Sequence, residues 1–179
     1  MVVRRSRRAR RSTLRAPWGA PAVLTVPWRL PEREVARMLA RHRDWLAAER
    51  ARQVPRLGLD PHTVSERAAR RRARARATVI AAEEAPALGV SYERIAIRDQ
   101  RTRWGSCSPL RTLSFNWRLV LAPDEVLDYV VIHELCHLRV PNHSLRFWSL
   151  VESRRPGWRQ QRAWLREHGP ELLAFRPAP

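Results

Sequence analysis

The sequence predicts an α+β fold, in which a small antiparallel or mixed sheet packs on helices and one further helix follows the sheet. Two long segments before residue 90 have the apolar spacing of helices. Short stretches with the residue types of strands then fill residues 92–120. An apolar run from Asp124 leads directly into a His-Glu-Leu-Cys-His motif at residues 133–137, so the helix that follows the sheet carries the main motif of the chain.

The N-terminal third is predicted to hold an arm, a hairpin and a helix. Residues 1–15 contain seven arginines and little to bury, which predicts a flexible basic arm. Two short apolar stretches on either side of Gly19 and Pro21 predict a hairpin. An amphipathic helix is expected from Pro31 to about Gln53. We expect residues 16–179 to form one domain, with its core at about residues 92–169.

The central third is predicted to hold a long helix and the sheet. The helix is expected from about Thr63 to Leu88, where Gly89 supplies a C-terminal cap. Arginines at positions 67, 70, 71 and 74 form one charged face of it, which is either solvated or a groove for acidic partners. Three strands are expected, at Tyr92–Arg98, Thr102–Cys107 and Thr112–Val120.

Two helices are predicted after the motif. Ser144 is the expected N-cap of the first, which ends before Pro156. The second is expected over Gly157–His168, with Gly169 as its stop.

Composition sets bounds on the class of protein. The 179 residues are 44% hydrophobic, which suits one domain with a core. The net charge is +18, and every basic residue is Arg; such a field attracts nucleic acid and other polyanions non-specifically, although host codon bias explains the composition equally well. Two cysteines, Cys107 and Cys136, do not make a disulfide scaffold, which favours a reducing cytoplasm. No signal peptide or membrane span is predicted.

The motif at residues 133–137 predicts a metal site with an adjacent base. His133 and His137 are four residues apart in a helix, so both imidazoles can face one ion. Glu134 lies about 100° around the helix from His133 and would reach a water on that ion, the position of a general base. A catalytic zinc needs three protein ligands and one open position. The alternative is a pair of ordinary buried histidines beside a helical glutamate.

His143 is the predicted third ligand. The turn signal Pro141-Asn142 follows His137 and can swing the chain back toward the ion. Glu152, on the next helix, is the rival third ligand, but imidazole is a good zinc ligand and the turn delivers it directly.

At these residues the chain resembles the YgjP-like metallopeptidases, which are zincins related to the SprT-like proteins. The resemblance is close over about Ile95–Gly169 and rests on these stretches: Arg101–Ser108, Phe115–Leu119, Tyr129–Leu138, Asn142–Ser144 and Phe147-Trp148. It implies a zincin-like fold, Zn²⁺ on His133, His137 and His143, and Glu134 as catalytic base. The implied activity is hydrolysis of a peptide or protein, and some members of the family have been assigned a nucleotide pyrophosphatase activity.

Three functions therefore stay open. We expect a zinc metallopeptidase; the alternatives are a nucleoside triphosphate pyrophosphatase and a nucleic-acid-associated protein whose zinc is structural. A structural zinc would need a fourth protein ligand, such as Cys136 or Glu152. Arg103 and Asn116 are predicted to donate hydrogen bonds to substrate, with an ion pair and a turn cap as their respective structural alternatives.

Overall fold

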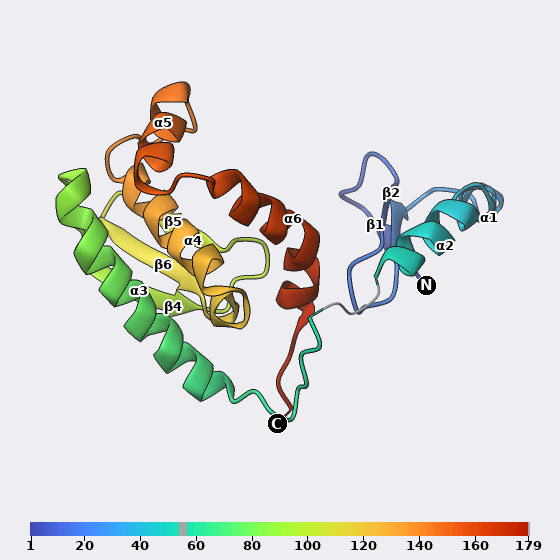
Figure 1. Cartoon of the computed structure of the whole chain (residues 1–179). Coiled ribbons are helices and arrows are strands. Elements are labelled where there is room, and N and C mark those ends of the chain that lie inside the picture. Colours follow the sequence, from blue (N-terminus) through green and yellow to red (C-terminus); the bar gives the residue numbers. More distant parts are fainter. Residues whose placement is uncertain (54–56, 179) are drawn as a thin grey trace. The chain divides into compact units, whose positions relative to one another are not determined.

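The computed structural model describes residues 1–53 and 57–178. The chain divides into two compact units, Met1–Gly58 and Leu59–Pro179 (Figure 1). We predicted one boundary after residue 15 and a single domain over 16–179; the units instead meet after Gly58, because the first residues fold with the hairpin and helices that follow them. Residues 54–56 and 179 of the predicted domain lie outside the described residues.

The N-terminal unit contains a three-stranded sheet in the order β1-β3-β2. Strand β1 (Val2–Ser6) pairs in parallel with β3 (Val23–Pro27), and β2 (Thr13–Arg15) pairs with β3 in antiparallel register. The β2–β3 pair is the predicted hairpin. The flexible arm predicted over residues 1–15 is wrong for this structure, since two of the three strands lie in it.

Arg5 explains why the basic segment is ordered. Its guanidinium donates to the carbonyl oxygens of Trp28 at 3.0 Å and Leu30 at 2.7 Å, and it forms an ion pair with Glu32. Charge alone predicted a solvated tail, but an arginine can bury its stem and satisfy backbone acceptors at the same time. The side chain therefore ties β1 to the segment after β3.

Two helices complete the N-terminal unit. The predicted single helix to Gln53 is divided at His42 into α1 (Glu32–Arg41) and α2 (Arg43–Arg52), because His42 departs from helical dihedral angles, with φ −99° and ψ 10°. The core of the unit consists of Leu24, Val26 and Val35, with four partly buried apolar residues packed against them.

The second unit is built on helix α3 (Glu66–Leu88) and a three-stranded sheet in the order β4-β6-β5. Helix α3 begins three residues later than predicted because the Ser65 side chain accepts a hydrogen bond from the Ala68 amide at 3.3 Å and caps it. Gly89 has φ +63° and is the predicted C-terminal cap. Most of the buried residues of α3 are alanines, which lets α4 pack closely beside it.

The predicted charged face of α3 is partly used inside the fold. Arg70 and Arg74 donate to the carbonyl oxygens of Ile97 at 3.5 Å and Ile95 at 2.8 Å. Both acceptors lie in β4, an edge strand, so these arginines satisfy an exposed strand edge.

The sheet is mixed, as predicted. Strand β4 (Arg94–Arg98) pairs in parallel with β6 (Thr112–Asn116), and β5 (Gly105–Cys107) pairs with β6 in antiparallel register. The predicted third strand to Val120 ends at Asn116, where the 3₁₀ helix η1 (Trp117–Leu121) begins. The Asn116 side chain causes this ending, because its Oδ1 accepts a hydrogen bond from the Arg118 amide at 3.1 Å.

Helix α4 (Asp124–His137) follows the sheet, which confirms the predicted α+β class. It contacts α3, α5, α6 and β5, and nine of its fourteen residues are buried, so it is the central helix of the unit. Figure 1 shows it beside the sheet, with α5 (Leu145–Arg154) and α6 (Trp158–Ala174) after it.

Gly169 does not stop the last helix, contrary to our prediction. Helix α6 continues to Ala174, and Gly169 is buried within it. A Cβ at Gly169 would lie 3.0 Å from a ring carbon of Trp104. The glycine therefore allows a close approach between the helix and this indole instead of marking a terminus.

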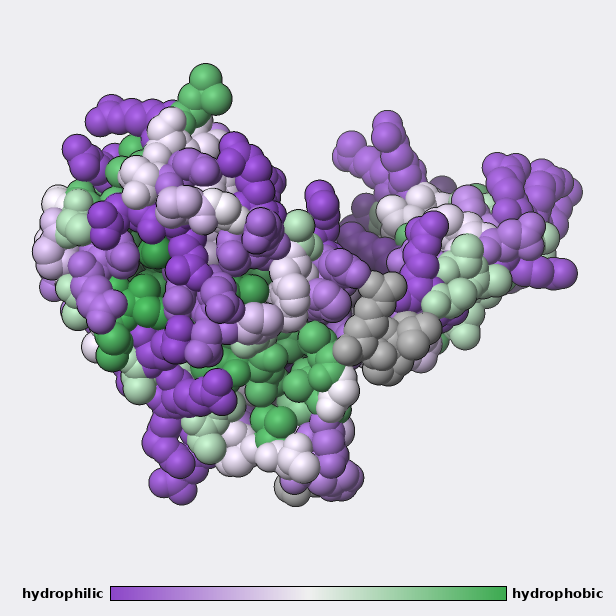
Figure 2. Space-filling model, viewed as in Figure 1, coloured by the Kyte–Doolittle hydropathy of each residue, from purple (hydrophilic) through white to green (hydrophobic). Residues whose placement is uncertain are grey.

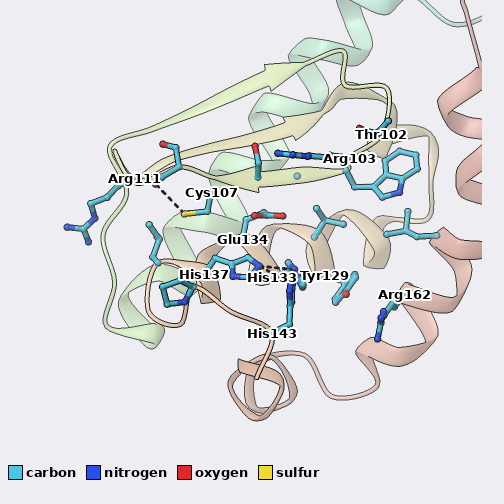
Figure 3. Close-up of a pocket in the computed structure, with 18 of the residues that line it drawn as sticks. Thr102, Arg103, Cys107, Arg111, Tyr129, His133, Glu134, His137, His143 and Arg162 are labelled. Carbon is cyan, nitrogen blue, oxygen red and sulfur yellow. Dashed lines mark hydrogen bonds between the residues drawn. The ribbon is translucent and has the colours of Figure 1, made fainter. Parts of the chain in front are cut away.

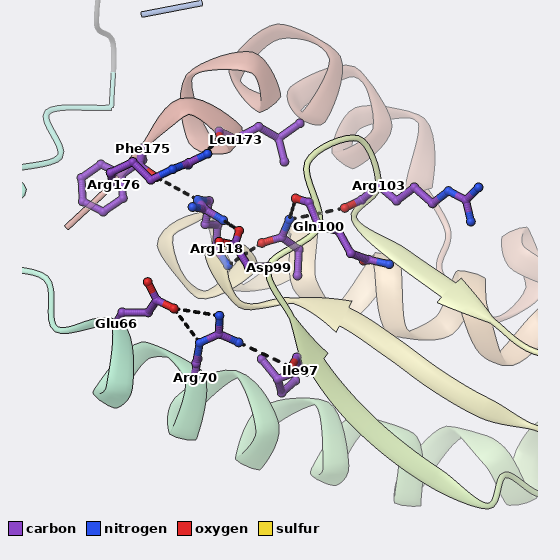
Figure 4. Close-up of polar contacts among 11 residues, drawn as sticks. Glu66, Arg70, Ile97, Asp99, Gln100, Arg103, Arg118, Leu173, Phe175 and Arg176 are labelled. Atoms are coloured by element: carbon purple, nitrogen blue, oxygen red, sulfur yellow. Dashed lines mark hydrogen bonds and ion pairs between the residues drawn. The ribbon is translucent and has the colours of Figure 1, made fainter.

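A buried arginine joins the loop after β4 to the end of α6 (Figure 4). Arg118 is fully buried, and its guanidinium forms an ion pair with Asp99 and donates to the Phe175 carbonyl oxygen at 3.0 Å. It also lies over the Trp117 ring, 4.3 Å from the centroid. The buried Arg118 guanidinium is thus paired with a carboxylate at the surface, because the Asp99 side chain is 43% exposed.

Charge covers much of the molecular surface. Residues 1–58 hold fifteen arginines against four acidic residues, so the excess positive charge is concentrated in the N-terminal unit. Figure 2 shows hydrophilic residues, in purple, over most of the visible face of both units. Within the described ranges, no helix has the length and apolar content needed to cross a lipid bilayer.

Candidate metal centre

Helix α4 presents two imidazoles on one face. His133 and His137 lie one turn apart, and their Nε2 atoms are 3.2 Å apart. The His137 Nδ1 faces the carbonyl oxygen of Val140 at 3.2 Å. A proton on Nδ1 makes this contact a hydrogen bond and leaves the Nε2 lone pair free, which is the usual way that a metal-binding histidine is oriented.

A turn after α4 brings the imidazole of His143 back to those of His133 and His137. The helix ends in a tighter turn, in which the backbone N–H groups of Leu138 and Arg139 donate to the carbonyl oxygens three residues earlier, at 3.1 Å each. The chain then reverses through Pro141 and Asn142. The Nε2 of His143 lies 3.1 Å from the Nε2 atoms of both His133 and His137.

The three nitrogens fit a single metal ion. They form the group of potential ligand atoms His133, His137 and His143. A tetrahedral ion at about 2.0–2.1 Å from each nitrogen separates its ligands by about 3.3 Å, close to the spacing here. Burial, followed by the charges of His137 and His143, lowers the pKa of His133 to about 3, and burial also lowers the pKa of His137. Both imidazoles are therefore neutral near pH 7, the form that binds metal.

Aromatic side chains from α5 fix the imidazoles. The Phe147 ring lies 4.4–4.9 Å from the ring centroids of all three histidines. Trp148 stacks on His143 with 5.5 Å between centroids. Because Phe147 is fully buried, it forms a rigid wall on one side of the imidazole cluster.

Glu134 is buried beside the cluster and close to β5. It is 6% exposed, and a Cβ at Gly105 would lie 2.6 Å from its Oε1, so no side chain larger than hydrogen fits there without movement. Burial raises the pKa of Glu134 to about 8, and the nearby Arg103 guanidinium opposes the shift. A divalent cation on the imidazoles would lower that pKa.

A cavity of about 890 Å³ opens over these residues. Its lining includes Glu134, the three imidazoles and all of strand β5. Figure 3 shows Glu134 and the imidazoles below the strands, with Arg103 on the loop above and Arg162 on α6 to one side. The cavity has the size of a ligand-binding site.

Comparison with known proteins agrees with this geometry. Residues 60–168 match the model of the YgjP-like metallopeptidase domain, which is more than half of the chain. The chain belongs to the YgjP-like metallopeptidase family. No curated protein sequence matches the chain significantly.

One solved structure is similar to this YgjP-like chain. It is the crystal structure of the metallopeptidase zymogen abylysin from Pyrococcus abyssi. The two chains are 23% identical, the TM-score is 0.46, and the alignment covers 57% of this chain and 99% of the other.

The two alternative metal ligands named from the sequence, Glu152 and Cys136, lie apart from the imidazole cluster. Glu152 forms an ion pair with Arg159 at 2.9 Å, and Cys136 is fully buried outside the cavity lining. Neither belongs to the group of potential ligands found among the described residues. Both Cys136 and Cys107 are free thiols.

The two predicted substrate contacts of the YgjP-like domain lie in different surroundings. Arg103 lines the cavity. Asn116 does not: it is fully buried, and its amide donates to the carbonyl oxygens of Gln100 at 2.7 Å and Arg103 at 3.4 Å. Asn116 is therefore not placed to bind substrate, because its side chain is used to hold the loop and cap η1.

Sequence reasoning missed Gly105 and Arg162. A glycine inside a predicted strand is a known sign of close approach, and this signal was present in the sequence at Gly105. Arg162 had no comparable signal, since it is one of many arginines and reaches the cavity only through the packing of α6.

Proposed function

We propose that this protein hydrolyses peptide bonds with Zn²⁺ held by His133, His137 and His143 and with Glu134 as the general base. The observation that carries the proposal is the convergence of three imidazole nitrogens at 3.1–3.2 Å beside a buried carboxyl group. When bound, zinc would polarise the scissile carbonyl and acidify a water. Three nitrogen ligands with an adjacent carboxylate favour zinc among common ions.

Glu134 would move the proton. Its carboxylate takes a proton from the attacking water and passes it to the leaving amine. Burial raises the pKa of this carboxyl group to about 8, and a divalent cation on the imidazoles would lower the pKa from there toward neutrality. With the metal bound, the group could therefore accept and then release a proton near the operating pH.

Strand β5 would hold the substrate. It is an edge strand of the sheet and lines the cavity, so an extended peptide can pair with its free edge as one more strand. Arg103, on the loop before β5, is a candidate donor to the peptide or to the developing oxyanion.

Hydrolysis of a nucleoside triphosphate is the second candidate. Four arginines line the cavity and could receive phosphates: Arg103, Arg111, Arg162 and Arg166. The third candidate, a structural zinc in a nucleic-acid-associated protein, has less support, because a structural zinc is usually closed by a fourth protein ligand. Among the described residues, the group of potential metal ligands contains three side chains, all of them histidines.

One experiment separates these functions. The purified protein is loaded with zinc, its metal content is measured, and it is assayed against an unfolded protein and a panel of nucleoside triphosphates. We expect about one zinc per chain and cleavage of the unfolded protein. Pyrophosphate release without peptide cleavage would replace the proposal with the second candidate. Stoichiometric zinc with salt-sensitive nucleic-acid binding and no turnover would favour the third.

Removing the metal should abolish activity reversibly. We expect dialysis against a chelator to stop peptide hydrolysis and added Zn²⁺ to restore it. His143→Ala should weaken zinc binding by about 100-fold or more, because one of three ligands is lost. Equilibrium dialysis with a competing chelator measures this. His62→Ala, which changes an exposed histidine outside the cavity, is the control, and unchanged zinc affinity in His143→Ala would contradict the ligand assignment.

Gly105→Ala should lower the rate of hydrolysis by about 10- to 100-fold with zinc retained. The added methyl group would lie 2.6–2.9 Å from three atoms of the Glu134 side chain and must displace the carboxylate, and misplacement by about 1 Å can cost that much. Steady-state kinetics and metal content measure both effects. In a Glu134→Gln background, Gly105→Ala should lower the rate of hydrolysis only slightly further. A full additional loss there would mean that Gly105 acts by another route.

A further inference from the structure

The side chains that line the cavity carry mostly positive charge. Among the described residues that line it, Glu134 is the only acidic one, whereas four arginines contribute to its wall. Arg162 differs from the rest because it lies over an aromatic platform.

Two stacked indoles hold the Arg162 guanidinium. Trp148 and Trp158 are stacked with 4.1 Å between centroids and 13° between planes. The Arg162 Cζ lies 5.1 Å from the Trp148 centroid and 5.8 Å from that of Trp158. Cation–π contacts of this kind hold a guanidinium in place while its N–H donors stay available.

The platform also connects Arg162 to the metal centre. Trp148 stacks on His143, and the opposite indole, Trp158, stacks on Tyr129 with 6.3 Å between centroids. Arg162 is therefore positioned by the same aromatic group that supports one of the candidate metal ligands.

A neighbouring arginine provides the contrast. Arg159 lies one turn earlier on α6 and also stacks on Trp158, at 4.6 Å. Its charge is paired with Glu152 at 2.9 Å, and it lies outside the cavity. Arg162, in contrast, lines the cavity. The two indoles therefore hold one guanidinium that is paired with a carboxylate outside the cavity and a second guanidinium at the cavity wall.

We propose that Arg162 binds a carboxylate of the peptide substrate, and that the substrates are peptides with a carboxylate close to the scissile bond. The inference rests on the proposed peptidase function and names its substrate class. The carboxylate can come from an Asp or Glu side chain or from the C-terminus of the peptide. A guanidinium with free donors recognises either through paired hydrogen bonds.

The test uses peptides of one length and sequence that differ only in charge. The parent has Gln near the cleaved bond and an amidated C-terminus; one variant has Glu at that position, and another has a free C-terminal carboxylate one or two residues beyond the bond. We expect the wild-type enzyme to prefer one of the acidic peptides by about 10- to 100-fold in kcat/KM. The peptide that gains this advantage identifies the source of the carboxylate.

Substitutions assign the preference to Arg162. Arg162→Gln should remove the advantage of the acidic peptide, mainly through KM, so that the acidic and neutral peptides are cleaved with similar kcat/KM. Arg162→Glu should reverse it, so that a peptide with Lys at the varied position is cleaved faster than one with Glu. Arg159→Gln should leave the preference intact. Equal losses on all peptides in Arg162→Gln would overturn the inference, as would equal cleavage of neutral and acidic peptides by the wild type.

Binding measured without turnover separates this inference from the proposed function. Zinc-loaded Glu134→Gln protein is titrated with the same peptides and with a nucleoside triphosphate. Preferential binding of an acidic peptide that depends on Arg162 would support the inference even if no peptide were cleaved by the wild type. Arg162-dependent binding of the nucleotide, with no preference among peptides, would overturn it.

Discussion

Replacing Glu134 with Gln should lower the rate of peptide hydrolysis by about 10²- to 10⁴-fold, the usual contribution of a general acid–base group. The amide is nearly the same size as the carboxyl group, so it fits the space left by Gly105, but it cannot take up the proton of water. The three imidazoles are unchanged, and zinc should stay bound at about one ion per chain. Steady-state hydrolysis of an unfolded protein and metal analysis on the same samples measure both.

Glu152→Gln is the matched control for this result. Like Glu134, Glu152 is a glutamate in a helix. It lies after the motif and forms an ion pair with Arg159 outside the cavity. We expect this variant to retain zinc and nearly full activity. Normal turnover in Glu134→Gln would exclude the carboxylate as the base, and loss of zinc in Glu152→Gln would restore it as a ligand.

Asp99→Ala should destabilise the protein by about 3–5 kcal/mol, more than Arg118→Met does. Asp99 is 43% exposed, whereas Arg118 is fully buried and has a buried Nη2 without a hydrogen-bond partner among the described residues. Removing Asp99 leaves an uncompensated buried cation, which typically costs that much. Removing Arg118 leaves a carboxylate that water can reach. Denaturant unfolding of the full chain measures both variants.

The double variant and the pH dependence sharpen this prediction. Asp99→Ala/Arg118→Met should be more stable than Asp99→Ala alone, because no buried cation remains. Burial raises the pKa of Asp99, but the hydrogen bond and charge of Arg118 outweigh it and hold the pKa below its ordinary value. The stabilisation by Asp99 should therefore be present above its unfolded pKa of about 3.9 and disappear as pH falls through the lower folded pKa. A double variant less stable than Asp99→Ala would contradict this account.

The sequence determined the local parts of the candidate metal centre. Four-residue spacing in a helix places His133 and His137 on one face whatever surrounds them. The turn at Pro141-Asn142 is short, so the return of His143 was also predictable. The cap at Gly89 and the hairpin before residue 30 are local in the same sense, because each depends on a few consecutive residues.

The tertiary structure decided what those parts face. Arg5 orders a segment that composition predicted to be flexible, through contacts more than twenty residues away. Asn116 is used inside the fold, while Arg162 reaches the cavity from a helix that begins fifteen residues after His143. A glycine is required at position 105 only because β5 lies against α4, where a larger side chain would contact Glu134. Residue spacing fixes geometry within one element, but contacts between elements depend on how their surfaces pack, and no local pattern records that.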